Sequence, residues 1–216
     1  MNKTKIAFLF FVFVSLLDIV GIIFKIPILV YVFKPLIIFS LIFLYVFSLP
    51  KRLKWYVIAL ELSFFGDVLL LFEGELFFIF GLISFLFAHL LFIKIVIDRI
   101  KKITLKSVLV PSIPFLVVFG LLIFTLKDSL NELLIPVIIY GLVISIFGTV
   151  SFLDFLKTKS KLSLLMLIGA VIFIISDATL AINKFYSPSH FFEILVMATY
   201  VLAQYFIFRS MVLVKK

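Results

Sequence analysis

Residues 76–97 read LFFIFGLISFLFAHLLFIKIVI, an apolar run in which Lys94 is the only formally charged residue. An α-helix rises about 1.5 Å per residue and a bilayer hydrocarbon layer is about 30 Å thick, so roughly 20 apolar residues cross it. Lys94 lies within about a turn of one end, where its long side chain can extend toward the membrane surface. The run therefore predicts a transmembrane helix.

The same kind of run recurs along the whole chain. Short charged or proline-containing connections separate eight apolar stretches, at residues 6–24, 28–49, 53–72, 76–97, 107–126, 133–153, 162–182 and 190–211. The first stretch resembles a signal peptide because Lys3 and Lys5 precede it, but it is long and no small-residue cleavage site follows it. We expect it to be retained, and the chain to be an all-α bundle of eight transmembrane helices.

Composition supports a single integral membrane domain over residues 1–216. The chain is 65% hydrophobic and 14% charged, whereas soluble domains are about 45–50% apolar and about 25% charged. Eight spans leave no residues for a separate soluble domain. The absence of cysteine excludes disulfides, zinc–thiolate sites and thiol nucleophiles.

The basic residues are distributed unequally over the two sides of the predicted bundle. One side, which holds both termini, carries 15 of them: Lys3, Lys5, Lys51, Arg52, Lys54, Arg99, Lys101, Lys102, Lys106, Lys157, Lys159, Lys161, Arg209, Lys215 and Lys216. The other side carries 3, namely Lys25, Lys127 and Lys184. Cytoplasmic loops hold the Lys and Arg excess, so we expect cytoplasmic termini in a bacterial-type inner or plasma membrane. The same distribution explains the net charge of +9 by topology, without a nucleic-acid partner.

The two halves of the chain share short matches. Ser63–Asp67 in the third span resembles Ile174–Asp177 in the seventh, and Ala88–Ile93 in the fourth resembles Ala203–Ile207 in the eighth. Four helices per half would make two parallel repeats. In a chain of such narrow composition, chance similarity explains the matches equally well.

Several polar side chains lie inside the predicted spans, where an ionisable group costs about 2.5–3.5 kcal/mol and by default marks function. They are Asp18, Lys34, Glu61, Asp67, His89, Asp177, Tyr200 and Gln204. Counted along the helices, Asp18, Lys34, Asp67 and Asp177 all lie roughly 20 Å from the cytoplasmic boundary, so they could meet in one layer. His89 and Gln204 lie nearer to about 10 Å.

Helical spacing adds local pairs, and each residue also has a structural interpretation. Ser63 lies four residues before Asp67, and Tyr200 four before Gln204, so each pair shares a helix face. Asp67 or Asp177 could instead form an ion pair with Lys34, and His89, Tyr200 and Gln204 could serve helix packing. The clustering in depth of several costly groups from different helices favours function.

These residues carry a resemblance to the YhhN-type lysoplasmalogenase family of polytopic membrane proteins. The matching positions follow the family-like order: Val32–Leu36; Ser63, Gly66, Asp67 and Leu70; Gly81 and Ala88–Leu91; Ser176 and Asp177; Tyr200, Gln204, Arg209 and Ser210. The resemblance implies hydrolysis of the vinyl-ether bond of a lysophospholipid, a lysoplasmalogen drawn from membrane lipid. The products would be a fatty aldehyde and glycerophosphoethanolamine or glycerophosphocholine.

Vinyl ethers hydrolyse by protonation at carbon to an oxocarbenium ion, followed by attack of water. This chemistry needs a carboxylic acid, a carboxylate that stabilises the cation and a base for water, as in glycosidases. Burial and the proximity of two carboxyls favour one protonated member. We expect Asp67 to be the acid, Asp177 the partner carboxylate and His89 the group that activates water or relays its proton. The expected substrate-binding residues are Lys34, which would bind phosphate or tune the carboxylates, together with Ser63, Tyr200 and Gln204.

Two other protein classes fit the same residues. In a transporter or channel, the intramembrane Asp, His and Lys side chains would form a proton or ion pathway. Pro111, Pro114 and Pro136 could mark broken helices, although prolines at helix starts are the simpler explanation. A non-catalytic membrane partner protein is the third class. The hydrolase chemistry requires no cofactor or metal, although one His and two Asp could form a facial metal site.

Overall fold

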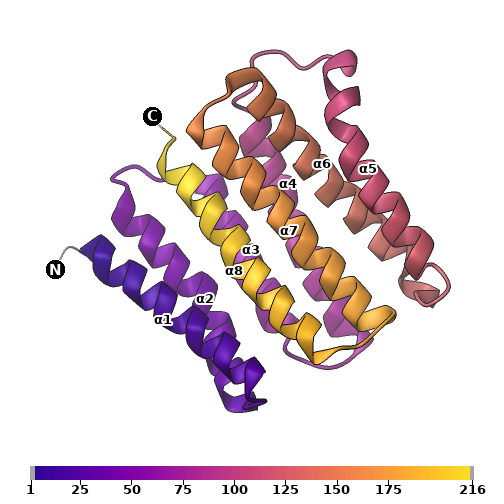
Figure 1. Ribbon diagram of the computed structural model, residues 1–216. Helices are drawn as coiled ribbons and strands as arrows, with labels where there is room; N and C mark the ends of the chain where they lie inside the picture. Colours follow the sequence, from indigo (N-terminus) through magenta and orange to yellow (C-terminus); the bar gives the residue numbers. More distant parts are fainter. Residues whose placement is uncertain (1–2, 215–216) are drawn as a thin grey trace.

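The computed structural model describes residues 3–214, which fold into eight α-helices and no strand (Figure 1). The elements are α1 (Lys3–Ile23), α2 (Pro27–Ser48), α3 (Lys54–Leu69), α4 (Glu75–Ile97), α5 (Leu105–Leu126), the short 3-10 helix η1 (Asn131–Leu133), α6 (Leu134–Thr158), α7 (Lys161–Phe185) and α8 (His190–Val212). The all-α prediction is confirmed. Lys215 and Lys216, which entered the comparison of basic residues, lie outside the described range.

Seven of the described helices are long and apolar enough to cross a membrane, with η1 counted as the start of α6. The eighth, α3, has 16 residues, which is shorter than a typical span. The chain is thus an integral multi-pass membrane protein with one short helix in its bundle. Its orientation in the membrane stays a prediction.

Local signals explain several helix boundaries. Pro27 occupies the first turn of α2, where its missing N–H costs nothing. Thr104 and Ser160 cap α5 and α7 by accepting a hydrogen bond from the backbone N–H three residues on. α5 continues through Pro111 and Pro114 without interruption, so the broken-helix interpretation of these two prolines is wrong.

Every helix end lies within five residues of its predicted boundary, and two of the differences have a clear local cause. α3 ends at Leu69, before residue 72, because the apolar residues that follow form the turn that leads to Gly74, whose φ is 119°. α6 continues to Thr158, beyond residue 153, and stops where Lys159 adopts a φ of 45°. Hydropathy cannot distinguish an apolar turn from an apolar helix, so the end of α3 could not be read from it.

The helices form four antiparallel hairpins, α1–α2, α3–α4, α5–α6 and α7–α8 (Figure 1). The chain ends and the α2–α3, α4–α5 and α6–α7 connections lie at one end of the bundle, which we call the basic end (Figure 1). The remaining four connections lie at the opposite end, called the far end below. This arrangement agrees with the eight-helix count.

The packing order resembles that of two parallel four-helix units. In both halves the first helix packs on the second, the second on the third and the third on the fourth, while α4 contacts α6 and α8 contacts α2. The halves differ at their first helices, because α1 also contacts α8 whereas α5 also contacts α7. α1 and α2 lie at one edge of the bundle and α5 at the other (Figure 1).

Candidate active site

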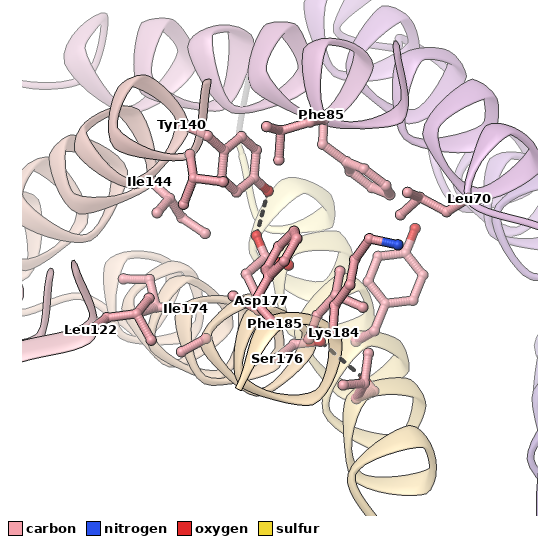
Figure 2. Close-up of a pocket in the computed structure, with 18 of the residues that line it drawn as sticks. Leu70, Phe85, Leu122, Tyr140, Ile144, Ile174, Ser176, Asp177, Lys184 and Phe185 are labelled. Carbon is pink, nitrogen blue, oxygen red and sulfur yellow. Dashed lines mark hydrogen bonds between the residues drawn. The ribbon is translucent and has the colours of Figure 1, made fainter. Parts of the chain in front are cut away.

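A cavity of about 180 Å³ lies within the bundle and is lined by residues of all helices from α2 to α8 (Figure 2). Its walls are mainly apolar and include Phe85 of α4, Phe119 and Leu122 of α5 and Ile144 of α6. Its polar lining consists of Lys34, Asp67, Tyr140, Ser145, Ser176, Asp177, Lys184 and Tyr200. An apolar cavity with a few converging polar groups is the usual form of a small-molecule site.

Asp67, near the far end of α3, is held by a tyrosine of another helix. The Tyr200 hydroxyl of α8 donates a hydrogen bond of 2.6 Å to Oδ2 of Asp67. One turn further along α8, Nε2 of Gln204 lies 3.5 Å from the Tyr200 oxygen, to which it donates. Asp67 is only 2% exposed, so this bond satisfies a carboxyl that would be costly to bury alone.

Asp177 of α7 has an equivalent partner. The Tyr140 hydroxyl of α6 donates a hydrogen bond to its Oδ2, as the dashed line in Figure 2 shows. Asp177 is half-buried because it faces the cavity, and it is close enough to Asp67 for electrostatic repulsion. Among residues 3–214 no hydrogen bond engages Oδ1 of Asp67 or Asp177, so both carboxyls keep an oxygen for a ligand.

Lys34 of α2 brings a positive charge to the same cavity. Its ammonium interacts electrostatically with Asp67 and Asp18. In the described range it forms no ion pair within 4.0 Å with any carboxylate. The structural alternative, in which Lys34 pairs directly with Asp67 or Asp177, is therefore not the arrangement seen, and the ammonium remains available to an anion.

Three of the four ionisable residues of the predicted layer line the cavity, and the fourth, Asp18, is close enough to Lys34 and Asp67 for electrostatic interaction. Lys34, Asp67 and Asp177 line the cavity, whereas Asp18 of α1 is fully buried outside it. Neither carboxyl oxygen of Asp18 has a hydrogen-bond partner among the described residues. Glu61, on the exposed side of α3, does not line the cavity either.

His89 of α4 lies behind the cavity wall. Its Nδ1 is 2.8 Å from the Phe85 carbonyl oxygen, and because a carbonyl only accepts, Nδ1 carries the proton and Nε2 the lone pair. Nε2 is buried without a partner in the described part of the chain. The ring is enclosed by four aromatic rings, those of Phe92, Tyr140, Phe147 and Phe173. Activation of water by His89 stays a prediction.

Ser63 and Gln204 also lie outside the cavity lining. The Ser63 hydroxyl donates to the Ala59 carbonyl at 2.9 Å, one turn back in α3, and not to Asp67. Gln204 is fully buried, and its Oε1 has no partner within the described residues. Gln204 thus supports Tyr200, and a direct substrate contact by Ser63 or Gln204 stays a prediction.

Three polar residues of the cavity lining, Tyr140, Ser145 and Lys184, were not predicted from the sequence. Tyr140 lies within an apolar helix, and a buried tyrosine hydroxyl usually requires a hydrogen-bond partner. The tyrosine in this apolar run could therefore have been recognised from the sequence as a candidate site residue. Lys184 was assigned to a connection, but it belongs to the last turn of α7 and lines the cavity. Its Nζ lies 4.8 Å from the centroid of the Phe78 ring, a cation–π contact.

The described residues contain no group of three or more His, Cys, Asp or Glu side chains that could hold a metal ion. The facial His–Asp–Asp alternative would require His89 to face the cavity together with Asp67 and Asp177. His89 is instead enclosed by aromatic rings. The arrangement therefore offers acid–base and electrostatic chemistry by two carboxyls, two tyrosines and two lysines.

Comparison with known proteins identifies the family of the chain. The model of the YhhN family matches residues 7–211, and that range includes every polar residue of the cavity. Searches of curated proteins and of solved structures find no match. Because the family model covers nearly the whole sequence, the chain belongs to the YhhN family.

Proposed function

We propose that this protein is a membrane hydrolase that cleaves the vinyl-ether bond of lysoplasmalogens, releasing a fatty aldehyde and glycerophosphoethanolamine or glycerophosphocholine. Family membership supports the hydrolase class. The observation that carries the proposal is the pair Asp67 and Asp177, each bonded to a tyrosine and both facing one apolar cavity. An enclosed apolar cavity suits a lipid chain, and paired carboxyls suit a reaction through an oxocarbenium ion.

The reaction consumes one water. A proton adds to the outer carbon of the C=C–O unit, and the positive charge is then shared between the other carbon and the ether oxygen. Water attacks that carbon, loses a proton and gives a hemiacetal, which collapses to the aldehyde and a free glycerol hydroxyl. A carboxylate beside the cation stabilises it far more strongly in a low-dielectric cavity than in water.

The two carboxyls differ in a way that suits two roles. Asp67 is almost fully enclosed, so we assign it the acid that protonates carbon. Asp177, half-buried and open to the cavity, is the carboxylate beside the cation. Tyr200 and Tyr140 fix their orientation, and Lys34 binds the substrate phosphate.

His89 is the proposed acceptor for the proton of the attacking water. Its lone pair is on Nε2, and its ring centroid lies 5.7 Å from that of Tyr140. Since it does not line the cavity, this transfer would pass through the Tyr140 hydroxyl or an ordered water.

The proposal is tested by Asp67→Asn in purified, folded protein. Loss of a general acid typically lowers the rate by about 10²–10⁴-fold, so aldehyde release from a lysoplasmalogen should fall by that factor. Glu61→Gln is the matched control, since it removes an exposed carboxyl from the same helix and should leave the rate unchanged. Activity of Asp67→Asn near the parent level would refute the assignment.

Proton-coupled transport of a small solute is the second candidate. One observation favours it: Asp18 is fully buried, has no hydrogen-bond partner in the described range and has no part in the hydrolysis. A hydrolase turns over lipid in detergent, whereas a transporter requires sealed vesicles and a gradient. Solute uptake that is driven by a pH gradient and abolished by Asp18→Asn, without aldehyde release, would establish transport instead.

A further inference from the structure

A second cavity, of about 500 Å³, opens at the far end of the bundle, around the α1–α2 and α3–α4 turns and the adjoining ends of α7 and α8. We call it the vestibule. Its lining is more polar than that of the inner cavity and includes charges of both signs: Lys25, Tyr31, Lys34, Glu73, Asn183 and Glu193. The vestibule therefore suits a polar ligand that carries both charges.

The vestibule adjoins the candidate active site. Five residues line both cavities: Lys34, Leu70, Leu180, Val196 and Met197. Lys34 is the only charged side chain that the two linings share, and its ammonium has no ion pair in the described range. An anionic group bound by Lys34 would lie at the junction of the vestibule and the inner cavity.

The charged side chains divide between the two cavities and their junction. Asp67, Asp177 and Lys184 line the inner cavity alone, Lys34 lines both cavities, and Lys25, Glu73 and Glu193 line the vestibule alone. Glu73 has no hydrogen bond or ion pair among residues 3–214. Glu193 accepts from His190 through Oε2 at 3.0 Å and keeps its other oxygen. Two acids thus lie beyond the lysine at the junction.

We propose that the vestibule binds the zwitterionic head group of a single-chain phospholipid. Lys34 and Lys25 contact the phosphate, Glu73 and Glu193 contact the ammonium, and the hydrocarbon chain lies in the inner cavity. This proposal rests on the hydrolase function above and adds the head-group residues to it. The bound lipid then runs from its hydrocarbon chain in the inner cavity, through the cleavable bond and the phosphate, to the amine in the vestibule. At that position the two acids select lipids whose head group carries a cation.

Binding of a non-hydrolysable lipid tests the vestibule separately from catalysis. Two saturated alkyl-ether lysolipids of equal chain length, one with a phosphoethanolamine head and one with phosphate alone, would compete for the detergent-purified protein. Native mass spectrometry gives the ratio of the two bound species. The parent protein should prefer the phosphoethanolamine lipid.

The variants separate the two charges of the head. Glu73→Gln combined with Glu193→Gln should reduce the preference by about three- to tenfold, because exposed ion pairs contribute little each, and the amide oxygen introduced by Glu193→Gln can still accept from His190. Lys25→Gln should weaken both lipids alike. Glu132→Gln, an exposed acid in η1 at the same end of the bundle, should leave the ratio unchanged.

An unchanged ratio in the double Glu variant would overturn the vestibule assignment, as would equal weakening of both lipids. Aldehyde release from a vinyl-ether lysolipid is measured on the same preparations. If the ratio shifts as expected but the parent protein releases no aldehyde, the vestibule stands and the hydrolase proposal fails. If aldehyde is released and the ratio does not shift, the reverse holds.

Discussion

Tyr200 and Tyr140 each carry a hydroxyl across a helix interface to a carboxyl of the cavity, from α8 to α3 and from α6 to α7. Two such bonds fix the direction in which Asp67 and Asp177 present their second oxygens. A buried hydrogen bond contributes about 0.5–1.5 kcal/mol between neutral groups and about 1.5–3 kcal/mol to a charged group. The tyrosines therefore position the two carboxyls of the proposed catalytic pair.

Tyr200→Phe tests this role because it removes one hydroxyl and keeps the ring. We expect kcat for aldehyde release to fall by about two- to tenfold, since Asp67 acts as a neutral acid and a neutral hydrogen bond contributes about 0.5–1.5 kcal/mol. Tyr205→Phe on the same helix is the control, as its hydroxyl accepts a bond from Arg209 and does not contact the cavity. Parent-level kcat in Tyr200→Phe would show that orientation of Asp67 does not depend on this bond.

The sequence allowed Lys34, Asp67 and Asp177 to be placed together because depth along a helix is a local property. It did not reveal that Ser63 bonds to its own helix or that His89 faces other aromatic rings. Both depend on the rotation of a helix relative to its neighbours. Ser and Thr hydroxyls often satisfy themselves on the preceding turn, so the pairing of Ser63 with Asp67 was weakly supported by spacing alone.

At the scale of helices, α7 and α8 pack closely against each other between the site and the basic end of the bundle. A Cβ added at Gly169 of α7 would lie 2.7 Å from Cγ1 and 3.0 Å from the backbone N of Ile207 in α8. The same face of α7 carries Ser176, whose hydroxyl donates to the Val196 carbonyl of α8 at 2.9 Å. A larger residue at position 169 would push these helices apart.

Gly169→Ala should lower the melting temperature of the detergent-purified protein, because overpacking costs about 1–3 kcal/mol and outweighs the roughly 1 kcal/mol that alanine gains in helix propensity. Gly120→Ala in α5 is the same chemical change where a Cβ meets nothing within 4 Å. That control should keep or raise the melting temperature. Equal melting temperatures for the two variants would contradict the close packing of α7 on α8.

Helix starts and ends could largely be predicted, because charges, prolines and capping residues are local signals. The end of α3 could not, since residues 70–72 are apolar and still form a turn. The partners of each helix were also beyond the sequence, apart from the weak repeat signal. The packing order has a matching pattern, with α4 on α6 and α8 on α2, and the sequence repeat itself stays a prediction.

At the scale of the whole molecule, the chain places its excess of basic residues at the end that holds both termini. The vestibule opens at the far end. If cytoplasmic loops hold the positive charge, lipid reaches the site from the outer leaflet. The composition predicted a multi-pass bundle, but the cavity depends on the distances between seven helices, which no local pattern specifies.

Single cysteines test the orientation cleanly because the chain has no cysteine of its own. Ser129→Cys introduces a thiol at the exposed α5–α6 connection of the far end, and Lys101→Cys one at the exposed α4–α5 connection of the basic end. In intact cells, a membrane-impermeant maleimide should label the Ser129→Cys variant and not the Lys101→Cys variant. The opposite pattern would invert the topology and place the vestibule on the cytoplasmic side.

The most direct measurement of the central claim compares two bonds in one assay. Detergent-purified parent protein is incubated with a vinyl-ether lysolipid and with the ester lysolipid of the same chain and head, and fatty aldehyde and fatty acid are followed together. The account predicts aldehyde from the vinyl ether and no fatty acid from the ester, because a carboxyl that protonates carbon acts on a C=C–O unit. Fatty acid from the ester, with no aldehyde from the vinyl ether, would contradict it.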